Sequence, residues 1–121
     1  MDVISGIVES PRKDGRFVLQ VGGKSFATVS LDIIERLQLA VGRSLSPELV
    51  ARVEHEAAML GAYDRALNML AFQPRSARDL KRRLVQKGEE ASHVDAAIER
   101  LVANGLLDDG AFARQFARSR V

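Results

Sequence analysis

The first thirty residues of the chain hold short apolar runs separated by turn residues, and Phe17, Leu19 and Val21 alternate with Arg16, Val18 and Gln20, which is the pattern of β-strands. Runs rich in Val, Ile and Phe occur at residues 2–9, 16–21 and 24–29. A turn-forming stretch with Pro11 and Gly15 separates the first two runs, and Gly22-Gly23, a tight hairpin signal, joins the second to the third. We therefore predict a three-stranded antiparallel sheet, which is too small to be stable without a covering helix.

After residue 29 the apolar spacing changes to three and four residues, which indicates helices. Ser30 is the expected N-cap of a helix that ends at Gly42 and covers the sheet with three apolar residues: Ile33, Ile34 and Leu37. A longer helical period begins with Ser46 as the cap and Pro47 at the first position. Gly61 interrupts this period, and the pattern leaves open whether it kinks the helix or splits it.

Residues 61–105 predict three helices with short connections. Pro74 ends the first helix, and Ser76, with Asp79 three residues later, caps the second. The second helix turns Leu80 and Leu84 inward and ends at Gly88.

The third predicted helix has its apolar residues at helical spacing and ends at Gly105; these are Val94, Ala97, Ile98, Leu101 and Val102. Its start is open between Glu90 and Ser92. A further helix signal opens at Asp108, with Phe112 and Phe116 on one stripe.

Two short segments resemble each other: "AYDRAL" begins at Ala62 and "AFARQF" begins at Ala111. This is the sign of a tandem helical repeat whose second copy has only begun. We therefore predict an α+β fold with a sheet and covering helix at 1–45, a linking helix at 46–60, a first three-helix repeat at 61–107 and the first helix of a second repeat at 108–121. Exposed Phe112 and Phe116 would then favour self-association.

Charge is segmented along the chain. Residues 75–87 hold six basic residues against one acidic residue, residues 88–111 hold one against six, and the last ten residues add three arginines. Such a dipolar pattern favours an electrostatically patterned binding face. The basic residues expected to contact a partner, through carboxylates or DNA phosphates, are Arg75, Arg78, Lys81, Arg82, Arg83, Lys87, Arg114, Arg118 and Arg120.

Catalytic chemistry has little support in the sequence. The chain has no cysteine, and its two histidines, His55 and His93, are interpreted as solvent-facing helix residues. Asp108 and Asp109 are better explained by a helix start than by a magnesium site. We expect no enzyme activity, no metal and no cofactor. No apolar run approaches a membrane span and no secretory signal is present, so we expect a cytoplasmic protein.

Five motifs follow one another in a fixed order: "PRSARDL" (74–80), Leu84, Lys87-Gly88, "IERLVANGLLDD" (98–109) and "FARQFARSR" (112–120). In these motifs the chain resembles the RecX family, the bacterial regulators of the RecA recombinase. Asp79 stands where the family usually has Glu, and Gly110 replaces a common acidic residue. Family members usually carry three such repeats.

The resemblance implies a non-catalytic regulator that binds the RecA nucleoprotein filament and inhibits its recombinase and ATPase activities in DNA repair, recombination and the SOS response. The alternative is a DNA-binding module of the helix-turn-helix or winged-helix type. Asp95 and Glu99 on the would-be recognition helix argue against specific reading of bases. Weak, non-specific contact of the basic segment with DNA stays open.

Overall fold

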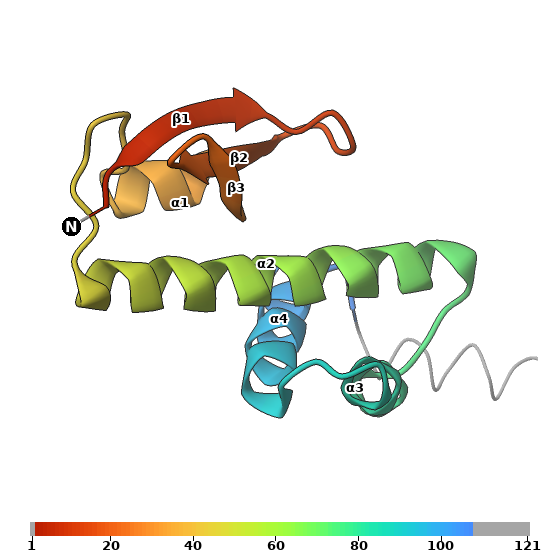
Figure 1. The fold of residues 1–121 in the computed structure, drawn as a ribbon. Helices are drawn as coiled ribbons and strands as arrows, with labels where there is room; N and C mark the ends of the chain where they lie inside the picture. Colours follow the sequence, from red (N-terminus) through yellow and green to blue (C-terminus); the bar gives the residue numbers. More distant parts are fainter. Residues whose placement is uncertain (1, 108–121) are drawn as a thin grey trace, which may run out of the picture. The chain divides into compact units, whose positions relative to one another are not determined.

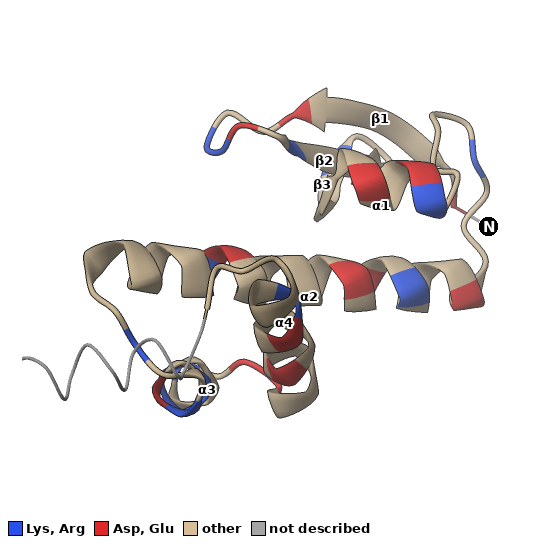
Figure 2. Cartoon of the chain, turned by 180° about the vertical axis from the view of Figure 1, so that it is seen from behind, with Lys and Arg blue, Asp and Glu red and all other residues tan. Residues whose placement is uncertain are grey.

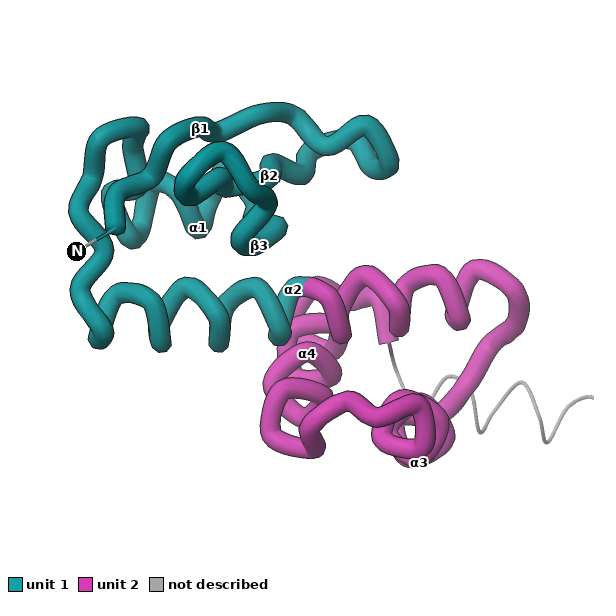
Figure 3. The backbone as a smooth tube through the Cα atoms, in the orientation of Figure 1, with its two compact units in different colours: residues 1–60 teal, residues 61–121 magenta. Residues whose placement is uncertain are grey.

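The computed structural model describes residues 2–107, and these fold into two compact units that are divided between Leu60 and Gly61. The elements are strands β1 (Ile4–Glu9), β2 (Arg16–Val21) and β3 (Lys24–Ser30) and helices α1 (Leu31–Arg36), α2 (Pro47–Phe72), α3 (Ala77–Gln86) and α4 (Ala91–Ala103), labelled in Figure 1. Figure 3 marks the two units, and α2 contributes residues to both. The predicted α+β class is confirmed, whereas the expected helix from Asp108 lies outside the described residues.

The sheet of the first unit has the predicted antiparallel order β1-β2-β3. Gly22 and Gly23 form the hairpin turn with φ angles of 60° and 75°, in the left-handed region that a two-residue turn requires. Register places Leu19 of β2 between Ile7 of β1 and Ala27 of β3. This row faces the core, so the sheet buries one side only.

The core of the first unit joins this sheet face to α1 and to the beginning of α2. Ser30 caps α1 by accepting a hydrogen bond from the Ile33 amide at 3.3 Å, as predicted. Ile33 and Leu37 are buried with Leu19 and Val29, and Ile34 packs beside them. Ser46 caps α2 in the same way, because its Oγ accepts from the Leu49 amide at 3.1 Å. Both predicted caps are confirmed.

The prediction that the covering helix continues to Gly42 is wrong, because α1 ends at Arg36. The residues that follow bond to β1 instead of continuing the helix: the Ile4 amide donates to the Arg43 carbonyl at 3.0 Å, and the Gly42 amide donates to the Ile4 carbonyl at 2.8 Å. Gln38 adopts a positive φ of 54° where the chain turns away from the helix. Backbone hydrogen bonds to β1 are therefore more favourable here than further turns of helix.

Helix α2 is continuous through Gly61, so the alternative in which Gly61 splits the helix is wrong. A glycine costs about 1 kcal/mol relative to alanine in a helix interior. Burial offsets this cost on both sides, since Leu60 belongs to the core of the first unit and Ala62 to that of the second. The absent side chain also leaves room for Arg65, because a Cβ at Gly61 would lie 2.9 Å from Arg65 Nη2.

The second unit packs the end of α2 against α3 and α4. Ser76 caps α3 by accepting from the Asp79 amide at 3.1 Å, and Gly88 and Gly105 follow the two helices with positive φ, as predicted. Of the two possible starts of α4 the structure has the earlier, with Glu90 at the cap position, so a start at Ser92 is wrong. Ser92 bonds the Glu90 carboxylate through its side chain at 3.0 Å rather than capping a helix.

The core of this unit is built from alanines of α2, leucines of α3, residues of α4 and one leucine beyond it; it comprises Ala62, Ala66, Leu80, Leu84, Val94, Ala97, Leu101 and Leu107. Polar bonds at the edge of this core connect the same elements. Nε and Nη2 of Arg65 donate to the two oxygens of the Glu89 carboxylate, which lies between α3 and α4, and Asn104 donates to the Tyr63 hydroxyl at 3.1 Å. The three helical segments are thus joined by both apolar and polar contacts.

Replacing Leu80 by alanine is expected to destabilise the second unit by about 2–5 kcal/mol, because a fully buried leucine leaves a cavity. Urea unfolding followed by circular dichroism measures the loss. Leu106, which is 50% exposed, offers the matched control, and Leu106→Ala should change stability by less than about 0.5 kcal/mol. Equal effects of the two substitutions would contradict the packing described here.

Candidate partner-binding surface

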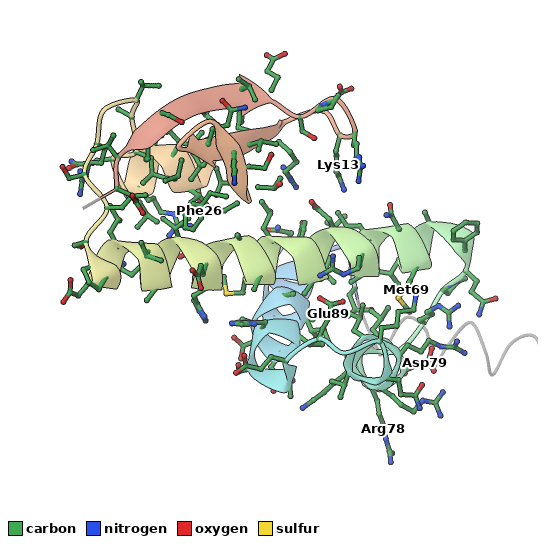
Figure 4. The ribbon with its side chains drawn as sticks, in the orientation of Figure 1. Lys13, Phe26, Met69, Arg78, Asp79 and Glu89 are labelled. Atoms are coloured by element: carbon green, nitrogen blue, oxygen red, sulfur yellow. The ribbon has the colours of Figure 1, made fainter. Side chains whose placement is uncertain are left out.

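The outer face of α3 is defined by what the helix buries. Leu80 and Leu84, four residues apart, are fully buried against the rest of the second unit. The opposite positions are exposed and carry Arg78, Lys81 and Arg82, and Arg78 points away from α2 in Figure 4. Figure 2 shows the cations gathered on α3 and the carboxylates on the neighbouring α4. The dipolar charge pattern is therefore a feature of the second unit's surface.

Asp79 organises three of the predicted arginines. Its carboxylate accepts from Arg75 Nη1 at 2.9 Å, from Arg82 Nη2 at 2.6 Å and from Arg83 Nε at 3.0 Å. The hydrogen bond from Arg75 and those from Arg83 and Arg82 lower the pKa of Asp79 to about 2, against the opposing effect of burial. Asp79 therefore does more than begin a helix, because it holds three cations in place.

The other predicted cations differ in their pairing. Arg75 is only 14% exposed, and its Nε is buried without a partner in the described part of the chain. Lys81 pairs with Asp95 of α4 at 2.9 Å. Arg78 forms no ion pair with any described residue, and neither does the side chain of Lys87 at the end of α3. Arg114, Arg118 and Arg120 lie outside the described residues, as do Phe112 and Phe116.

Two depressions lie on the outer face of α3. The larger, of about 390 Å³, is lined in the described chain by Arg78, Lys81, Arg82, Val85 and Gln86. The smaller, of about 280 Å³, is lined by Ser76, Arg78, Asp79 and Arg82. Arg78 and Arg82 therefore border both. The sequence analysis did not single out Val85 and Gln86, although they follow Arg78 at i+7 and i+8 on one helix face, a spacing that could have indicated them.

The described residues offer no metal site, since no three potential metal ligands among His, Cys, Asp and Glu gather within residues 2–107. His55 is exposed on α2, as expected. The interpretation of His93 as solvent-facing is wrong, because its side chain is 18% exposed and its Nδ1 lies 3.7 Å from the Glu90 carboxylate. No helix within residues 2–107 has the length and apolar character that crossing a membrane requires.

Comparison with known proteins locates this unit in a family. A family model described as "RecX, first three-helix domain" matches residues 62–101, which hold most of the core of the second unit. "Regulatory protein RecX" of Halorhodospira halophila is 40% identical over 68 residues, which cover 56% of this chain and 42% of that protein. Residues 62–101 therefore carry the first three-helix domain of RecX proteins.

Further RecX proteins extend the likeness to the first unit. "Regulatory protein RecX" of Geobacillus kaustophilus is 29% identical over 124 residues, which cover 99% of this chain and 46% of that protein. A solved structure titled "Crystal structure of regulatory protein RecX" superposes on this chain with a TM-score of 0.80 at 24% identity. The superposition covers 98% of this chain and 58% of the chain in that structure, and it supports the fold. The chain spans less than half the length of the curated RecX relatives named here.

The ion pairs of Asp79 predict a specific pH dependence of stability. Because the pKa of Asp79 is lowered from 3.8 to about 2, its contribution to folding is present above pH 3.8 and is lost as the pH falls through about 2. Asp79→Asn should therefore be less stable than the natural chain at pH 6, and the difference should shrink between pH 4 and pH 2. Thermal unfolding across this range measures it.

Asp95→Asn provides the control for this experiment, since Asp95 pairs with one cation on an exposed surface. Its difference from the natural chain should be small throughout. A difference for Asp79→Asn that stays constant down to pH 2 would mean that the three arginine contacts do not stabilise the folded chain.

Proposed function

We propose that this chain acts as a RecX protein acts on RecA, in the cytoplasm: it binds the RecA nucleoprotein filament and inhibits filament extension, ATP turnover and strand exchange without catalysing a reaction. The observation that carries the proposal is the exposed cationic face of α3 on the unit that matches the first RecX three-helix domain. A regulator of this kind needs only binding free energy and a defined orientation.

The charge arrangement supports a protein partner with complementary charge. Arg78, Lys81 and Arg82 present positive charge on α3, while Asp95 and Glu99 of α4 present negative charge within the same unit. Opposite charges that lie side by side favour one docking register and disfavour the reversed one. A filament repeats the same subunit surface along its length, so a fixed register is what a regulator that bridges neighbouring subunits requires.

The surface of α4 argues against a helix-turn-helix module that reads bases. A recognition helix in the major groove uses cationic or amide side chains toward base edges. The exposed positions of α4 carry Asp95 and Glu99 with Arg100 as the basic residue among them. Phosphates would be repelled by these carboxylates, so the proposal allows DNA contact only through α3 and without specific reading of bases.

Reversing the charges of Arg78 and Arg82 to glutamate is expected to weaken binding to RecA filaments by roughly tenfold or more at physiological salt. Co-sedimentation with RecA filaments on single-stranded DNA measures the affinity, beside a DNA-only sample and across a salt series. The matched control reverses Arg12 and Arg52, which are exposed on the first unit and change the net charge equally.

Loss of filament binding in the Arg78/Arg82 variant, with the Arg12/Arg52 variant unchanged, supports the proposal. Equal affinity of all three proteins for the filament would remove these arginines from the interface. Binding of the natural chain to bare DNA as strongly as to the filament would favour the DNA-binding alternative.

A further inference from the structure

The larger depression on α3 is amphipathic rather than only cationic. Val85 is 40% exposed and stands one helical turn beyond Lys81 and Arg82, with Arg78 a further turn away. Lysine and arginine side chains have an aliphatic stem and a charged end. The floor of the depression is therefore apolar and its rim is charged. Such a surface suits a ligand that has both an apolar group and a negative charge.

The pairing of the cations limits the ligand further. Arg82 is held by Asp79 and Lys81 by Asp95, which leaves Arg78 as the cation of this depression without an ion pair among the described residues. Affinity for DNA rises with the number of phosphates that a surface neutralises, and one unpaired arginine neutralises few. A protein segment needs only one or two carboxylates at this place. Arg78 and Arg82 can donate hydrogen bonds to them.

An apolar side chain of a protein partner can bury apolar surface on Val85, which a phosphate backbone cannot do. Covering the exposed part of Val85 removes apolar surface from water, and this contribution does not weaken with salt. The depression of about 390 Å³ lies toward the small end of the roughly 300–1,000 Å³ typical of ligand pockets, so it accommodates a short stretch of a partner.

We propose that the depression lined by Arg78, Lys81, Arg82, Val85 and Gln86 seats a short acidic and apolar segment of a protein partner. An apolar side chain of the partner lies on Val85, and a carboxylate of the partner accepts hydrogen bonds from Arg78. The inference rests on the proposed function only in taking the RecA filament as the source of this segment, and the depression can be tested without RecA.

The test replaces Val85 by serine in the full chain, with Val102→Ser as the matched control, because Val102 is an exposed valine of α4 outside the depression. The probes are a fluorescein-labelled helical peptide with two glutamates four residues apart and a leucine between them, the same residues scrambled, and a thymidine oligonucleotide of equal charge. Fluorescence anisotropy at two salt concentrations reports their affinities, and co-sedimentation reports binding to the RecA filament.

Val85→Ser is expected to weaken binding of the peptide and of the filament by roughly three- to tenfold, the range expected for covering part of a valine. Val102→Ser should leave both unchanged, and the loss should persist at high salt. Identical behaviour of the two variants, or an oligonucleotide that binds as well as the peptide, overturns the proposal.

Failure of this proposal and failure of the proposed function give different results. If filament binding depends on Arg78 but not on Val85, the depression is not the seat of a partner segment and the RecA proposal stands. If the natural chain binds the peptide through Val85 and does not bind the filament, the depression is a docking site and the RecA proposal fails.

Discussion

Burial of two leucines on α3 is the constraint from which the rest of the candidate surface follows. A ten-residue helix with so many charges is not stable alone, so its contacts with α2 and α4 hold it in place. Leu80 and Leu84 supply those contacts and set the rotation of the helix about its axis. Rotation by one residue would bury an arginine or a lysine, which is far more costly than burying leucine. The cations and Val85 therefore occupy the outer face as a necessary consequence of the core.

Some cations of this surface form ion pairs with Asp79, and others are left available to a partner. Arg75 is mostly buried beside Asp79, and Arg82 and Arg83 are restrained by it, whereas Arg78 is left without an ion pair among the described residues. Restraining side chains before a partner arrives lowers the entropy that binding must otherwise remove. The aspartate here accepts from three arginines at close range.

Local signals predicted a large part of the fold. Ser30, Ser46 and Ser76 cap the helices that their positions indicated, and Gly22-Gly23 forms the expected hairpin turn. These features depend on a few neighbouring residues, which a sequence shows directly. The predicted extent of α1 failed because it depended on distant contacts: the helix ends early, and Gly42 and Arg43 bond to Ile4 of β1. The question that the pattern left open at Gly61 also depended on such contacts, since α2 passes through it with both flanks buried.

The sequence predicted which residue types form the candidate surface, but not which of them are buried, paired or exposed. The excess of basic residues at 75–87 is plain in the sequence, and helical spacing places several of them on one face. Which arginine is buried, which is paired and which apolar residue lies between them depends on the packing of α3 against its neighbours. Val85 illustrates this, since its spacing from Arg78 places it on the cationic face, but only the packing of α3 shows that it is 40% exposed.

The most direct measurement uses the absence of cysteine from the chain, which allows a single reactive site to be placed at will. Position 85 is changed to cysteine and carries a photo-crosslinker, and position 102 on α4 is treated in the same way for comparison. On a RecA filament assembled on single-stranded DNA, the account predicts crosslinks to RecA from position 85 and few from position 102. Equal crosslinking from both positions, or crosslinks from position 85 to DNA instead of RecA, would contradict it.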